Sequence, residues 1–187
     1  MPLRDLPIAL VGLRGVGKTT VGRLLARELA LDFIDLDEEI ARRAVSRGQA
    51  DVGSSAGDLL ARRGLTEFRA LETSALEDLL AATRPLVLAA GGGVVEAEFN
   101  RKLLRRRALC VWLRDAPEVL SVRVDADPAR RPALVLGGSL AEARELDRIR
   151  APLYSEVARI ELDCGARTPE KIAAALLQGL AVLRASP

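Results

Sequence analysis

The chain has 187 residues, of which 49% are apolar and 29% charged, so it has the length and composition of one folded domain and not those of a disordered protein. It contains 28 basic and 26 acidic residues, and a formal net charge of +2 gives no reason to expect a polyanionic partner such as a nucleic acid. Histidine is absent and there are only two cysteines, Cys110 and Cys164, which excludes histidine-dependent nucleophilic catalysis and leaves no ligand set for structural zinc.

The sequence also lacks the features of exported and membrane-inserted proteins. It has no stretch of 18 apolar residues, and its first residues, MPLRDLP, do not form the apolar segment of a secretory signal. Two cysteines without metal or redox spacing are typical of a reducing compartment. We therefore expect a cytoplasmic protein that makes no use of a membrane.

Strand-like apolar segments alternate with segments of helical period along the chain. The pattern predicts five strands, at 7–11, 33–36, 86–90, 109–113 and 160–163. It predicts helices at 18–31, 38–47, 58–63 and 66–82 (on either side of Gly64), 96–107, from Pro117, at 139–158 and from Pro169 to about 183. Loops are predicted at 48–57 and 130–138. This alternation predicts a single α/β domain over 1–187, with three α/β/α layers and a central parallel, five-stranded sheet. Functional residues are expected just after the strands, because ligands bind at the carboxyl ends of such sheets.

A phosphate-binding motif follows the first predicted strand. The segment GLRGVGKT, Gly12 to Thr19, matches G-x-x-x-x-G-K-S/T and lies between a predicted strand and a predicted helix. Its glycines bring backbone N–H groups close to a phosphate, Lys18 can reach the β- and γ-phosphates of ATP, and the Thr19 hydroxyl suits Mg²⁺. The alternative is a glycine-rich turn that binds nothing. The expected nucleotide-binding residues of this P-loop (12–20) are Gly12, Gly15, Val16, Gly17, Lys18, Thr19 and Thr20.

Two carboxylates stand at the end of the second predicted strand. Asp35 and Asp37 flank Leu36, and a spacing of two places both side chains on the same side of an extended chain. If the strand ends between them, one can hold Mg²⁺ through water and the other can orient a hydroxyl group. The alternative is that Asp37 merely caps the helix that follows.

Further candidates point to a carboxylate-bearing acceptor. Arg69 and Glu72 lie three residues apart, so Glu72 can hold the guanidinium as a partner for a substrate carboxylate, although an ordinary surface ion pair is the alternative. The glycines of 91–93 allow a ligand to approach the backbone, or they form a simple turn. Arg131 and Arg150 suit a phosphate and a carboxylate, respectively, but each alone is one arginine among many.

Taken together and in this order, the motifs resemble those of the shikimate kinase family. They are GLRGVGKTTVG (12–22), FIDLDEEI (33–40), FRALE (68–72), GGGVV (91–95), RRP (130–132) and RAPLY (150–154). The resemblance implies a P-loop kinase fold of the nucleoside-monophosphate-kinase type, with a helical substrate-binding region at about 37–72 and a mobile lid at about 125–138. It also implies Mg²⁺-dependent transfer of the γ-phosphoryl group of ATP to the 3-hydroxyl of shikimate, a step of aromatic amino acid biosynthesis.

The resemblance also implies a role for each matching residue. Lys18 and Arg131 would stabilise the phosphoryl charge, and Asp37 would hold the ring hydroxyls and help to deprotonate the attacking one. Thr19 would bind Mg²⁺ directly and Asp35 through water. The implied substrate-binding residues are Asp37, Arg69, Gly91, Gly92, Gly93 and Arg150.

The chain departs from the family pattern at several positions. Arg14 stands in the P-loop where a small residue is common, and Ala90 precedes the glycines where Thr or Ser is often found. The 48–57 segment is longer than expected beside the shikimate pocket, and the lid has RRPAL instead of RPLL. Arg123 aligns only loosely with the arginine that stacks on adenine.

Two other functions remain open at this point. One is a kinase of the same fold that acts on a substrate such as gluconate, and the other is a non-catalytic, ligand-sensing domain related to shikimate kinases. The Arg105–Arg107 segment has no interleaved aromatic residues, so we interpret it as a solvated helix end and expect no nucleic-acid partner. We also expect a monomer, because one core accounts for the apolar stripes.

Overall fold

The computed structural model describes residues 6–82, 84–127 and 137–185. Arg131 lies outside these residues. The same is true of most of the loop predicted at 130–138 and of the lid expected at 125–138, of which the structure describes only 125–127 and 137–138.

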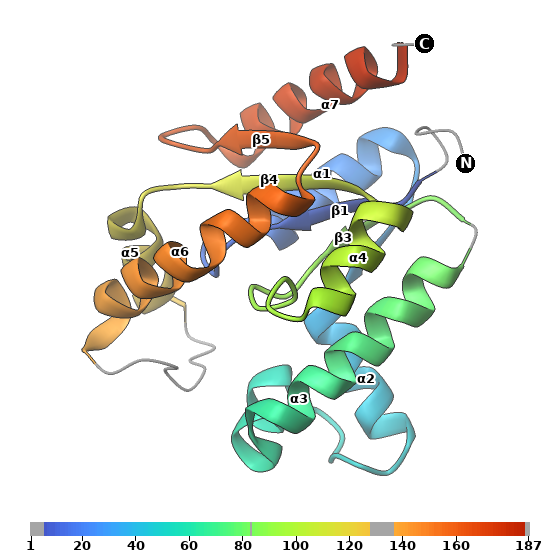
Figure 1. The fold of residues 1–187 in the computed structure, drawn as a ribbon, viewed down its shortest axis with the longest axis vertical. Coiled ribbons are helices and arrows are strands. Elements are labelled where there is room, and N and C mark those ends of the chain that lie inside the picture. Colours follow the sequence, from blue (N-terminus) through green and yellow to red (C-terminus); the bar gives the residue numbers. More distant parts are fainter. Residues whose placement is uncertain (1–5, 83, 128–136, 186–187) are drawn as a thin grey trace.

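The centre of the molecule is a five-stranded parallel sheet, as predicted (Figure 1). Its strands are β1 (Ile8–Val11), β2 (Asp32–Asp35), β3 (Leu86–Ala89), β4 (Leu109–Arg114) and β5 (Ile160–Asp163). They lie in the order β2-β3-β1-β4-β5, and in the register Ala9 of β1 pairs with Leu88 of β3 and Cys110 of β4. All residues of β1 and β3 are buried, as expected for central parallel strands that are covered on both faces.

Helices cover both faces of this sheet. They are α1 (Lys18–Leu29), α2 (Leu36–Ser46), α3 (Ala56–Ala81), α4 (Glu98–Arg107), α5 (Pro117–Asp125), α6 (Gly138–Val157) and α7 (Pro169–Ala185). Helices α1 and α7 pack together on one face, whereas α4 and α6 lie on the other (Figure 1). Helices α2 and α3 pack against each other at one end of the molecule and form the helical region predicted at about 37–72 (Figure 1). The structure therefore has the three predicted layers.

Local sequence signals explain most of the helix ends. Ser55 caps α3 through a capping box with Asp58, which ends the predicted loop two residues earlier than expected. Gly64 breaks α3 as predicted, since its φ of 79° is left-handed and lies outside the helical range. Pro117 begins α5 as predicted, and the arginines of 105–107 form the exposed last turn of α4.

Two further predicted boundaries, both beside the site, also differ from the structure. The second strand was expected to include Leu36, but it ends at Asp35, whose side chain starts α2 by accepting hydrogen bonds from the backbone N–H groups of Asp37 and Glu38. The helix predicted from Glu96 begins at Glu98. The preceding residues form turns instead, because the Glu96 N–H bonds to the Gly93 carbonyl at 3.0 Å.

The sheet brings the predicted functional segments to one edge. The P-loop follows β1, Asp35 ends β2, and the 91–93 glycines come just after β3. All of these strands run in the same direction, so their carboxyl ends meet on one side. A site assembled there lies where open parallel sheets bind their ligands.

Candidate active site

The P-loop has a backbone conformation that requires its glycines. Gly12 has a φ of 140°, and a Cβ atom at this position would overlap the carbonyl oxygen of Leu113. Gly17 has a φ of 95° and is the N-cap of α1, so the loop turns directly into the positive end of a helix dipole. This conformation suits a loop that binds an anion.

Lys18 lies over this loop. Its Nζ donates hydrogen bonds of 2.9 Å to the carbonyl oxygens of Gly12 and Leu13. A cavity of about 390 Å³ opens beside it, and its lining includes Gly15, Gly17, Lys18, Thr19 and Thr20. The side chain of Val16, in contrast, is buried in the core and does not line this cavity. A triphosphate in the cavity would meet backbone N–H groups, a helix N-terminus and an ammonium group.

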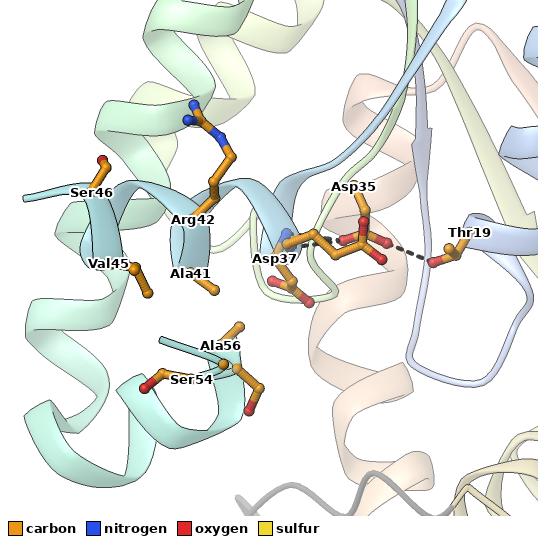
Figure 2. Close-up of a pocket in the computed structure, with 12 residues that line it drawn as sticks. Thr19, Asp35, Asp37, Ala41, Arg42, Val45, Ser46, Ser54 and Ala56 are labelled. Carbon is orange, nitrogen blue, oxygen red and sulfur yellow. Dashed lines mark hydrogen bonds between the residues drawn. The ribbon is translucent and has the colours of Figure 1, made fainter. Parts of the chain in front are cut away.

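A hydroxyl and a carboxylate meet beside the loop. Thr19 Oγ1 donates a hydrogen bond of 2.7 Å to Asp35 Oδ2 (Figure 2). Asp35 Oδ1 accepts from the backbone N–H of Asp37 at 3.0 Å, so Asp35 caps α2 and the alternative in which Asp37 caps it is wrong. Hydroxyl and carboxylate oxygens are hard donors of the kind that Mg²⁺ prefers, so the pair fits that ion. Within the described part of the chain, no cluster of three or more Asp, Glu or Cys side chains could hold a metal.

Asp37 connects two cavities. It lies in the first turn of α2 and lines both the P-loop cavity and a second cavity of about 90 Å³. Arg14, Gly91 and Gly92 line both cavities as well, so the two spaces meet at this group of residues. Asp37 therefore lies where a group in the smaller cavity would face a phosphate in the larger one.

The smaller cavity is bounded by two arginines from distant helices. Arg69 of α3 and Arg150 of α6 both line it, with Glu72 nearby. Arg69 Nη1 donates to both Glu72 oxygens at 3.1 and 3.0 Å, which confirms the predicted pair. Arg150 is only 4% exposed, so it is not an ordinary surface arginine. Two guanidinium groups that line one small cavity suit a carboxylate ligand. We call these two residues the arginine clamp.

Glu72 is a buried carboxyl group beside this clamp. Its side chain is 1% exposed, and loss of hydration raises its pKa from 4.5 to about 7. The positive charge of Arg69 acts against this shift, while the negative charge of Asp37 adds to it. The Arg69–Glu72 contact is thus a buried structural pair, and the alternative of a surface ion pair is wrong.

The glycines at 91–93 have a packing role that the sequence did not reveal. A Cβ atom at Gly93 would overlap the Arg69 guanidinium, and one at Gly91 would lie 2.7 Å from Glu72 Oε1. The Tyr154 hydroxyl donates a hydrogen bond to the Gly92 carbonyl. Close approach to this backbone was predicted for a ligand, but the groups that approach it here are side chains of the site itself.

Arginines also border the nucleotide cavity. Arg123 of α5 lines it, donates to the Gly15 carbonyl at 3.4 Å and lies 3.1 Å from Asp115. Arg14 also lines it and pairs with Asp127 at 3.3 Å, next to the start of the expected lid. The predicted phosphate contact of Arg131 falls outside the described residues.

A further cavity of about 730 Å³ lies between α2 and the segment at 53–56. Asp35, Asp37 and Thr19 stand at one end of it, and Ala41 and Val45 of α2 face the segment that carries Ala56 (Figure 2). Ala56 lines the arginine-clamp cavity as well. The long 48–57 segment thus contributes to the surroundings of the acceptor side, as expected from its position.

Glu96 is the site residue that sequence reasoning missed. Its Oε1 accepts from Arg150 Nε and Nη2 at 2.8 and 2.6 Å, and its Oε2 accepts from Arg69 Nε at 3.1 Å. The sequence placed it at the start of a helix, where a glutamate needs no further explanation. No sequence signal distinguishes it from other acidic residues, because its partners lie 27 and 54 positions away.

The comparisons with known proteins decide the family. A model of the family described as "Shikimate kinase" matches residues 14–181. The chain belongs to the shikimate kinase family. Relatives named shikimate kinase include one from Paracidovorax citrulli, 42% identical over 181 residues that cover 95% of this chain and 91% of the relative. Another, from Bordetella pertussis, is 40% identical and covers 94% of this chain and 79% of the relative.

Solved structures agree with the family and with the fold. A shikimate kinase from Acinetobacter baumannii in complex with shikimate superposes with a TM-score of 0.87 at 33% identity, covering 98% of this chain and 97% of that one. A gluconokinase from Sinorhizobium meliloti has a TM-score of 0.62 at 20% identity and coverage of 98% and 95%. The second likeness shows a shared fold alone. The prediction of a three-layer P-loop kinase fold is thereby confirmed.

Proposed function

We propose that this member of the shikimate kinase family transfers the γ-phosphoryl group of ATP to the 3-hydroxyl of shikimate, giving ADP and shikimate 3-phosphate. The observation that carries the proposal is the meeting of two cavities at Asp37. One is lined by a P-loop and the other by the arginine clamp. This arrangement suits a reaction between a nucleoside triphosphate and a hydroxylated carboxylic acid.

On the nucleotide side, the chain supplies charge and position. The P-loop N–H groups and the α1 N-terminus would hold the phosphate chain, and Lys18 would leave the loop carbonyls to pair with the transferring phosphoryl group. Thr19 and Asp35 would hold Mg²⁺, which neutralises phosphate charge when bound. Arg131 would add charge to the phosphoryl group, and Arg123 would contact the adenine side.

On the acceptor side, the chain supplies orientation. Arg69 and Arg150 would take the shikimate carboxylate, and the 91–93 backbone would border the ring. Asp37 would then accept a hydrogen bond from the attacking hydroxyl and receive its proton as the new P–O bond forms. A site without histidine is sufficient, because phosphoryl transfer depends mainly on alignment and on stabilisation of charge.

A gluconate-type kinase is the second candidate, since a gluconokinase shares the fold. The clamp alone does not exclude it, because gluconate also carries a carboxylate. Shikimate is favoured because relatives named shikimate kinase are 40–42% identical to this chain, whereas the gluconokinase is 20% identical. A ligand-sensing domain would bind both molecules without turnover.

An assay of coupled ADP release tests the proposal. Purified protein with ATP and Mg²⁺ is offered shikimate, gluconate, quinate and no acceptor. We expect saturable ADP release with shikimate and formation of one phosphate ester per ADP. Turnover with gluconate but not with shikimate would overturn the assignment, and binding of ATP and shikimate without ADP release would indicate a sensor.

The proposal includes a cytoplasmic monomer that acts on small molecules and has no nucleic-acid partner. Cys110 and Cys164 are both free and buried, which suits a reducing compartment. Among the described helices, none has the length and apolar character needed to cross a membrane. Light scattering of the purified chain tests the monomer.

A further inference from the structure

Glu96 forms a bridge within the acceptor site. Each of its two carboxylate oxygens takes one guanidinium: Oε1 faces Arg150 at 2.8 and 2.6 Å, and Oε2 faces Arg69 at 3.1 and 3.0 Å. Two cations that line one cavity repel each other, and these are largely removed from water, with side chains 20% and 5% exposed. A shared carboxylate offsets that repulsion and fixes the distance between them.

Glu96 contacts the two arginines from outside the arginine-clamp cavity. Both arginines line the cavity, but Glu96 does not. Glu96 binds the Nε–Nη2 edge of each guanidinium. Arg150 Nη1 is left on the side of Gly92, 3.6 Å from where a Cβ atom on that residue would stand. The edges bound to Glu96 therefore set the angle at which the remaining N–H groups of Arg150 face the cavity.

Hydrogen bonds also hold the backbone of Glu96 in place. Arg101 Nη1 donates to the carbonyl oxygens of Val95 and Glu96 at 2.8 and 3.1 Å, and the Glu96 N–H bonds to the Gly93 carbonyl at 3.0 Å. Anchors on both sides of the peptide restrict where the carboxylate can stand. This is the construction expected of a support for other side chains and not of a group that swings away when a ligand arrives.

We propose that Glu96 is a positioning residue that couples Arg69 to Arg150 and so determines the affinity of the clamp for the substrate carboxylate. This inference rests on the proposed function for the identity of that substrate. The bridge holds the two guanidiniums at one separation before the acid enters, so a single carboxylate can meet both at once. Glu96 itself touches neither the reacting hydroxyl nor the phosphate.

The test is a Glu96→Gln variant, which keeps the shape of the side chain and removes its charge. We expect its KM for shikimate to rise about tenfold, the scale of one charge-assisted hydrogen bond, while kcat and the KM for ATP stay within about twofold. Glu96→Asp should recover part of the loss. Glu98→Gln is the matched control, because Glu98 is two residues away, exposed and paired with Lys102 at 2.6 Å. It should leave all three constants unchanged.

Two kinetic results would overturn the proposal. A KM for shikimate that falls in Glu96→Gln would show that Glu96 competes with the substrate for the clamp. Equal constants in Glu96→Gln and Glu98→Gln would show that the bridge does not affect binding.

A second measurement separates this proposal from the proposed function. Cyclohex-1-ene-1-carboxylate has a ring carboxylate but no hydroxyl group to phosphorylate, so its binding does not depend on turnover. We expect this acid to raise the melting temperature of the wild type and of Glu98→Gln, and to raise that of Glu96→Gln much less. Wild-type protein that is stabilised by the acid but inactive with shikimate would contradict the proposed function alone. Equal stabilisation of all three proteins would contradict the role of Glu96 alone.

Discussion

The two halves of the site are built in different ways. The centre of the nucleotide half is one continuous segment, residues 12–19, which combines backbone N–H groups and a helix end with the ammonium group of Lys18. The acceptor half takes Arg69 from α3, Arg150 from α6 and Glu96 from the turn before α4, and long-range ion pairs connect them. The first half depends on local conformation, and the second depends on tertiary structure.

Because of this difference, we expect substitutions to have different effects in the two halves. A P-loop keeps its shape as long as its glycines and the flanking strand and helix remain. The arginine clamp, in contrast, requires three segments to meet. The acceptor half also contains Glu72, whose side chain is 1% exposed, and removal of a charged partner there leaves an uncompensated charge in the interior. Substitutions in the nucleotide half should therefore reduce kcat, and those in the acceptor half should raise the KM for the acid.

The largest effect is expected for Lys18→Ala. This change removes the charge aimed at the transferring phosphoryl group, so kcat should fall by about 10³-fold or more. Lys102→Ala is the control, because Lys102 is exposed and pairs only with Glu98 within the described contacts. Single-turnover measurement of ADP formation checks the prediction, and a near-normal rate in Lys18→Ala would contradict the assigned role.

Arg69→Ala should have the largest effect on the acid. Loss of one charge-assisted contact predicts a rise of about 10- to 100-fold in the KM for shikimate, with little change in the KM for ATP. Arg62→Ala on the same helix is the control, since Arg62 is exposed and pairs with Asp51. Steady-state kinetics with each substrate varied in turn provides the test. A selective rise in the KM for ATP would move Arg69 to the nucleotide half.

A smaller effect of the same kind is expected for Gly93→Ala. The added methyl group would displace the Arg69 guanidinium, so the KM for shikimate should rise by about tenfold without a change in charge. Gly179→Ala is the control, because a Cβ atom there would make only an ordinary contact of 3.5 Å with Ile160. If both alanine variants bind shikimate like the wild type, the close packing of Arg69 on this backbone is unimportant for affinity.

The last prediction concerns stability and its dependence on pH, not catalysis. Because burial raises the pKa of Glu72 from 4.5 to about 7, the folded protein keeps a proton that the unfolded chain releases in this range. The free energy of unfolding should therefore fall as pH rises from about 5 to 7, by at most about 3 kcal/mol from this group. Glu72→Gln should remove that part of the slope.

Urea titrations at several pH values measure this slope. Glu98→Gln is again the control, since the bond from Lys102 lowers the pKa of Glu98 and gives its contribution the opposite sign. Parallel slopes in the wild type and Glu72→Gln would contradict a raised pKa for Glu72.

The sequence was sufficient to place the P-loop between a strand and a helix and to locate the strands and most helices along the chain. A P-loop is a local motif, and Gly64, Ser55 and Pro117 act on their own neighbours, so their effects can be inferred without a structure. The boundary at Asp35 was wrong because a carboxylate that caps a helix and one that ends a strand look alike in sequence.

The acceptor half was only partly predictable. Arg69 and Arg150 were candidates from the sequence, and the family resemblance assigned them to the substrate, but their connection through Glu96 spans 27 and 54 positions and no periodicity encodes it. The glycines at 91–93 were linked to a ligand, whereas their immediate neighbours are Arg69 and Glu72. Contacts of this kind depend on how helices pack on the sheet, which local patterns do not specify.

A structure with shikimate and a non-hydrolysable ATP analogue tests the central claim most directly. The account predicts that the shikimate carboxylate lies within hydrogen-bond distance of Arg69 and Arg150, while Glu96 still bridges them, and that the 3-hydroxyl lies beside Asp37 and faces the terminal phosphate near Lys18. A carboxylate bound away from the clamp, or a 3-hydroxyl out of reach of that phosphate, would contradict it.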